Sequence, residues 1–143
     1  MNESVLACYF ACAAGVDHED DWIDAALARI ASQIQRGEWD KATASCDNFV
    51  ADMEGHFAFE ELVIAQTEFA GAGGHRSHHA AGLAIIRQLL GQLPAIAAAA
   101  GAGLDTDSLL ARLRDFGHHA KAHVARYDQS LCRHAGRLAR VTG

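Results

Sequence analysis

Apolar residues recur at helical spacing over long stretches of this sequence, and glycine or proline breaks the pattern at only a few places. Over residues 18–36, acidic side chains stand in the first turn and arginines come later, which complements a helix dipole. The apolar residues of this stretch share one face at intervals of three or four: Ile23, Leu27, Ile30 and Ile34. Gly37 then interrupts the pattern, which predicts an amphipathic helix over 18–36.

Two more segments follow the same pattern. Residues 38–69 form a long run with an apolar face, and the glycine-rich stretch 70–74 breaks it. Residues 75–93 form the next run. Because proline lacks a backbone N–H and clashes inside a helix, Pro94 is expected to end this one.

The remainder of the chain predicts one more long helix. Residues 95–105 are interpreted as a helical tail and a loop, after which Thr106 or Asp107 can cap the last helix. Half of the residues are hydrophobic, and alanine and leucine favour helix over sheet. The sequence therefore predicts an all-α fold: one domain over 1–143, an antiparallel up-down four-helix bundle in which residues 1–16 form an N-terminal arm.

Charge and cysteine content narrow the class of protein. The net charge is −6, and no basic stripe is present, which argues against nucleic acid as a partner. The apolar stretch at 5–15 is too short to span a membrane, and no lysine or arginine precedes it, so we expect neither a membrane span nor a signal peptide. The four cysteines lack zinc-site spacing and fit a reducing, cytoplasmic compartment.

Nine histidines are the unusual part of the composition, and several stand four residues from a second possible metal ligand. Residues four apart on a helix lie on one face, about 6 Å apart along its axis. The pairs with this spacing are His56 and Glu60, His75 and His79, and His119 and His123. One such pair alone is more often a surface pair or a satisfied core histidine. Their combination in one bundle favours a metal site, since buried imidazoles and carboxylates would otherwise be costly.

Three motifs resemble those of the hemerythrins and the wider hemerythrin-like, HHE cation-binding domains. They are "HFAFEE" from residue 56, "HRSHH" from residue 75 and "HVARYD" from residue 123, and the resemblance extends over about residues 15–134. It implies reversible O2 binding at two non-haem iron ions, joined by carboxylates and an oxo or hydroxo group. By this resemblance His75, His79 and His123 hold one iron and His56 helps to hold the second. Glu60 and Asp128 bridge the two.

Helical spacing alone does not select Asp128. It follows His123 by five residues, which is about 140° around an ideal helix. Only the resemblance assigns it to the site. Tyr127, one turn beyond His123, could ligate or donate a hydrogen bond, although packing is the simpler account.

The first helix departs from the family pattern, in which Ile-Asp is followed three residues later by a ligand histidine. Here "WIDAAL" places Leu27 at that position, and His18 is about 13 Å away along the helix. Three repairs are open: a histidine from the last helix (His119, or less favourably His118), the carboxylate of Glu61, or water. We expect Leu27 to line the pocket, together with Phe57 and Phe59, while His78 and His134 are expected to face solvent.

Three functions fit these features. The first is an O2-binding protein for oxygen storage, delivery or sensing. The second is a di-iron or mononuclear iron enzyme that acts on O2, peroxide or NO, because an open metal position suits catalysis. The third is a module that binds or senses metal.

Overall fold

The structure is a computed structural model that describes residues 16–99 and 106–142. Within these ranges every element is helical. The elements are α2 (Val16–Gln35), α3 (Trp39–Thr67), α4 (Ala72–Ala98), α5 (Thr106–His123), the π-helical turn η1 (Val124–Asp128) and α6 (Gln129–Thr142). The predicted all-α class is confirmed for the described residues. The predicted N-terminal arm, apart from Val16, lies outside them.

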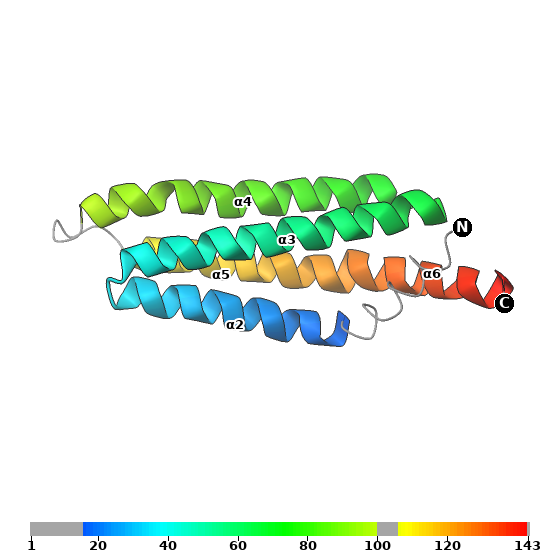
Figure 1. Ribbon diagram of the computed structural model, residues 1–143, viewed down its shortest axis with the longest axis horizontal. Helices are drawn as coiled ribbons and strands as arrows, with labels where there is room; N and C mark the ends of the chain where they lie inside the picture. The colour runs from blue at the N-terminus through cyan, green and yellow to red at the C-terminus, as the bar shows by residue number, and fades with distance from the viewer. Residues whose placement is uncertain (1–15, 100–105, 143) are drawn as a thin grey trace.

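The helices form a bundle whose members lie side by side along its long axis (Figure 1). Helix α3 contacts α2 and α4, and α5 contacts the same two helices, so the four helices surround a common core. Helix α5, the turn η1 and α6 follow one another directly and form the fourth rod. The predicted bundle is therefore confirmed, and its antiparallel up-down order stays a prediction.

Helix α4 differs most from expectation. It begins at Ala72 and continues through Pro94 to Ala98, so the predicted stop at Pro94 is wrong. Pro94 is exposed, whereas Leu93 is fully buried and Ile96 packs against the core, and this packing outweighs the lost hydrogen bond. By length and composition alone α4 could cross a membrane, a test that core helices of bundles also pass.

Two apolar clusters fill the bundle, and a polar layer lies between them. Along α3, Phe57 belongs to the larger cluster and Val63 to the smaller one. Along the fourth rod, Val124 belongs to the larger cluster and Leu131 to the smaller. Glu60 lies between the first two positions and Asp128 lies between the second two, and both side chains are buried.

Candidate metal centre

Five buried side chains converge between the two apolar clusters. Each offers one possible ligand atom, and these atoms all lie within 4.8 Å of one another. We call them the buried cluster: Glu60, His75, His79, His123 and Asp128. Helix α3 provides the glutamate, α4 provides two histidines one turn apart, α5 provides the third histidine and η1 the aspartate. His75, His79 and His123 form the three-histidine group of this cluster.

A π-helical turn brings Asp128 into the cluster. The N–H of Gln129 donates to the carbonyl of Val124, five residues earlier, so the helix is wider here than an α-helix. This wider turn returns Asp128 to the face of His123, whose Nε2 lies 2.8 Å from Asp128 Oδ1. The spacing of five that an α-helix could not explain is therefore the spacing of this turn.

Glu60 faces histidines with both of its oxygens. Its Oε2 lies 2.9 Å from His75 Nε2, 2.7 Å from His79 Nε2 and 3.8 Å from His123 Nε2. Its Oε1 lies 2.9 Å from His56 Nε2, on the other side. One oxygen thus turns to the three-histidine group and the other to His56.

Asp128 divides its oxygens in the same way. Its Oδ1 lies 3.2 Å from His75 Nε2 as well as 2.8 Å from His123 Nε2, whereas its Oδ2 lies 3.9 Å from His56 Nε2. His56 is not one of the five clustered residues, and its side chain is 32% exposed. Both carboxylates therefore lie between a buried three-histidine side and a partly open side at His56.

The ionisation of the cluster follows from these contacts. Burial alone would raise the pKa of Glu60 and Asp128, but hydrogen bonds from the surrounding histidines outweigh it and lower both values. Burial alone would lower the pKa of His75, but hydrogen bonds and charge from Asp128 and Glu60 raise it to about 9. The same causes raise the pKa of His123. Protons on imidazoles thus balance two buried carboxylates at neutral pH.

These donors fit a metal ion. Three imidazole nitrogens point at one carboxylate oxygen, an arrangement that needs positive charge between them, either as protons or as a cation. His75 Nδ1 is buried without a hydrogen-bond partner in the described part of the chain, so its Nε2 is the ring atom that serves the cluster. Imidazole and carboxylate together suit iron, zinc and other transition metals.

Glu61 lies behind His79 rather than in the cluster. Its Oε1 is 3.3 Å from His79 Nδ1, and its other oxygen pairs with Arg76. A carboxylate in this place orients a histidine whose other nitrogen faces a metal. Of the three repairs predicted for a missing ligand, this one therefore takes a supporting position in the structure.

His78 contacts the Nδ1 atom of His123, on the side of the ring away from the carboxylates. The sequence analysis did not predict this contact. The two Nδ1 atoms lie 2.8 Å apart, so His78 is not the solvated residue that we expected. Burial, with the charges of His119 and His123, lowers the pKa of His78 to about 4, which keeps its ring neutral and able to accept a proton from His123. Only the adjacent histidines of "HRSHH" hinted at this role. His134, also expected in solvent, is half-buried and contacts the carbonyl of Thr67.

The other two proposed replacement ligands lie outside the cluster. The ring of His119 stacks on His78, with centroids 3.9 Å apart, and its Nε2 lies 3.4 Å from the backbone oxygen of His78. His118 lines a groove between α2 and α5. Tyr127 packs its ring 5.4 Å from that of His123 and 5.5 Å from that of His75.

The predicted pocket-lining residues separate into three places. Phe57 stacks on His79 with ring centroids 3.8 Å apart, and it lines a small, partly enclosed cavity beside His123. Phe59 packs instead against the smaller apolar cluster.

Leu27 lies away from the buried cluster. A Cβ atom at Gly117 would be 3.0 Å from Leu27 Cδ1, and Gly117 precedes His123 by six residues, about 9 Å along the helix. Ile23, one turn earlier on α2, is the residue that lines the cavity beside His123. The place of Leu27 in the fold therefore does not support its interpretation as a lost ligand position.

The comparisons with known proteins agree with this geometry. Residues 14–135 match the family model described as the hemerythrin HHE cation binding domain, a range that contains the whole buried cluster and His56. No curated protein and no solved structure gave a significant match.

Proposed function

Because the chain belongs to the hemerythrin HHE cation-binding domain family, we propose that its metal centre holds two iron ions and binds O2 reversibly. The family and the buried cluster together support metal binding. The identity of the metal, the number of ions and the role in oxygen storage, delivery or sensing are our inference.

The division of the carboxylate oxygens carries this proposal. Glu60 and Asp128 each turn one oxygen to the three-histidine group and the other to His56. A carboxylate that faces donors on two sides suits a bridge between two ions. The three-histidine group would hold one ion and His56 would help to hold the second, with the carboxylates of Glu60 and Asp128 available to both. Iron held there in the ferrous state would supply the electrons needed to bind O2.

The space beside His123 favours a very small ligand. The partly enclosed cavity there has a volume of only about 10 Å³, enough for about one water-sized molecule. Its walls include the apolar side chains of Phe57, Phe116 and Val124. A diatomic gas fits this space better than an organic substrate does.

One observation favours a second candidate function. The side chain of His56 is 32% exposed, so the second ion would lie nearer to solvent than the first. An accessible metal position suits turnover, and an iron enzyme that acts on O2, peroxide or NO is therefore the alternative.

We also infer the path of the chain and its location. Residues 36–38 join α2 to α3, and residues 68–71 join α3 to α4. Connections this short suit antiparallel neighbours and hence an up-down bundle. The four cysteines, which lack zinc-site spacing and fit a reducing compartment, make a cytoplasmic location our proposal.

Cycles of O2 exposure and removal test the function. Protein loaded with ferrous iron without oxygen should gain a visible absorption band under O2 and lose it when O2 is removed, over repeated cycles. Glu60→Gln should abolish the band, whereas Glu54→Gln, an exposed carboxylate on the same helix, should leave it unchanged. Iron that oxidises once and never releases O2, or steady consumption of peroxide or NO, would overturn the carrier function and favour the enzyme.

A further inference from the structure

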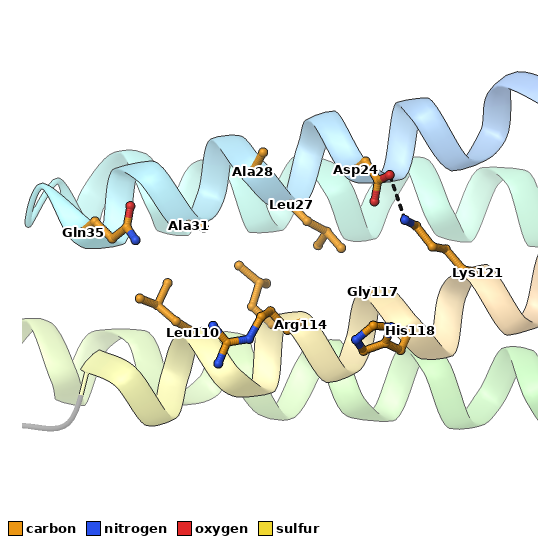
Figure 2. A pocket seen from close by; sticks show the side chains of 11 residues that line it. Asp24, Leu27, Ala28, Ala31, Gln35, Leu110, Arg114, Gly117, His118 and Lys121 are labelled. Carbon is orange, nitrogen blue, oxygen red and sulfur yellow. Dashed lines mark ion pairs between the residues drawn. The ribbon is translucent and has the colours of Figure 1, made fainter.

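A groove of about 380 Å³ lies between α2 and α5, apart from the metal centre. This volume lies within the range of sites that bind small organic molecules. Figure 2 shows the two helices with Leu27 reaching from α2 towards α5, and with Leu110, Arg114 and His118 along the α5 side. The lining of the groove also includes Ala28, Ala31, Leu113, Gly117 and the pair Asp24 and Lys121.

Small side chains keep the groove open. Ala28 and Ala31 on α2 and Gly117 on α5 stand where larger residues would fill the space between the helices. Leu27 packs against Gly117: a Cβ atom added at Gly117 would lie only 3.0 Å from Leu27 Cδ1. Leu27 and Leu113 are buried and form an apolar floor.

The side chains at the rim of the groove carry one more positive charge than negative charge. Asp24 and Lys121 form an ion pair of 2.9 Å at one end of the groove, where the carboxylate is already engaged (Figure 2). Arg114 has no ion-pair partner among residues 16–99 and 106–142, although the chain as a whole is acidic. His118 follows Arg114 by four residues on the same face of α5, so both can reach one bound group.

We propose that this groove binds a small molecule that joins an apolar body to one carboxylate. The guanidinium of Arg114 matches a carboxylate with two parallel hydrogen bonds, and His118 can add a third. The apolar floor takes the body of the ligand. A single negative charge is favoured because the lining carries one positive charge beyond the Asp24–Lys121 pair, and Asp24 would repel a more highly charged anion.

This proposal does not depend on the metal centre. None of the groove residues belongs to the buried cluster, and the test needs no metal. Loss of iron binding would leave it intact, and failure of the groove would leave the proposed oxygen function intact.

Titration of the full-length, metal-free chain with decanoate, followed by amide and methyl NMR shifts, tests the proposal. Saturable shifts at Leu27, Ala31 and Gly117 are expected. Arg114→Gln should weaken binding by about tenfold, the loss expected for one charge-assisted hydrogen-bonded pair. Ala31→Leu, which fills the apolar floor without a change of charge, should weaken it as strongly. Decanol, which lacks the carboxylate, should bind as weakly to the native chain as decanoate binds to Arg114→Gln.

Arg112→Gln is the matched control, since Arg112 lies on the same helix and contacts Gln92 outside the groove. It should bind decanoate like the native chain. Equal affinity of Arg114→Gln and native protein, or shifts that never saturate, would overturn the proposal. So would NOE contacts in the free chain between Leu27 and residues 1–15, which would assign the groove to that segment. A dimer that Ala31→Leu dissolves would assign it to a second copy.

Discussion

The orientation of single imidazole rings decides whether the buried cluster can bind metal. His79 and His123 present Nε2 to the carboxylates, and their Nδ1 atoms face Glu61 and His78. These outer partners fix the protonated nitrogen of each ring. One of these partners, His78, was expected to face solvent. The sequence could not place it, because spacing along one helix does not show which side chains of the next helix face it.

His78→Phe tests this role. The aromatic ring can still stack on His119, but it cannot accept the Nδ1 proton of His123. We expect the affinity for ferrous iron to fall by about tenfold, with helicity unchanged. His118→Phe is the control because His118 lies in the groove away from the cluster. Equal affinities of native protein and His78→Phe would contradict the role, and equilibrium titration with iron measures them.

The raised pKa values of His75 and His123 predict a pH dependence of metal binding. Because metal must displace protons from these rings, its affinity should rise as pH increases from about 6.5 towards the His75 value of about 9. Calorimetry in buffers of different ionisation enthalpy should detect proton release. An affinity that stays constant over this range would contradict the ionisation described for the cluster.

The metal-free protein should show the opposite trend in stability. A histidine whose pKa is raised on folding stabilises the fold below its ordinary value of 6.5, and this contribution is lost as pH rises to about 9. The lowered pKa values of Glu60 and Asp128 contribute stability that is lost only in acid. Thermal unfolding without metal should therefore occur at lower temperature at pH 9 than at pH 6.5. A melting temperature that rises between these pH values would exclude the predicted linkage.

Leu27→His tests the interpretation that the first helix lacks a ligand at this position. Since Leu27 packs against Gly117 away from the cluster, the new imidazole should bind no additional iron. It should lower the free energy of unfolding by about 1–3 kcal/mol, because a polar imidazole ring replaces an apolar isobutyl side chain in the core. Leu27→Met is the volume-matched control. Urea unfolding and metal analysis measure both effects, and an extra equivalent of iron would restore the original interpretation.

At the scale of elements, the helices could be predicted from the sequence, but the turn η1 could not. The helices were predictable because their apolar residues repeat with α-helical spacing. Asp128 was not predictable from spacing, because a π-helical turn obeys a different period, and only the family resemblance pointed to it. The course of α4 through Pro94 likewise depends on packing against other helices, which a local rule about proline does not include.

Moving the carboxylate by one residue tests this turn. In an ordinary α-helix, an aspartate at position 127 would take the place of a ligand beside His123. In the wider turn the carboxylate of Asp128 reaches His123 Nε2, and the residue at position 127 packs against the rings of His123 and His75 instead. The double variant Tyr127→Asp/Asp128→Ala should therefore lose iron as completely as Asp128→Ala alone. Circular dichroism should verify that both variants stay folded. Recovery of iron binding by the double variant would show that the turn is not required.

At the scale of the whole molecule, the cluster depends on how three rods align along the bundle axis. Sequence spacing paired residues within one helix, such as His75 with His79. It could not establish the alignment of His123 with Glu60, since the two residues lie on different helices. The two apolar clusters on either side of the polar layer fix this alignment in the folded protein. The layer buries two carboxylates among imidazoles, which is costly unless protons on the imidazoles or a bound cation balance the negative charge.

Iron content per chain after anaerobic loading with ferrous iron is the most direct test of this account. The native chain should bind about two ions. The Asp128→Asn variant should lose both ions or bind them more weakly, because its side chain no longer carries a charged carboxylate that can bridge two ions. Glu54→Gln should retain both. A native chain that binds one ion or none, or an Asp128→Asn variant that binds iron as tightly as the native chain, would contradict a two-iron centre built on Glu60 and Asp128.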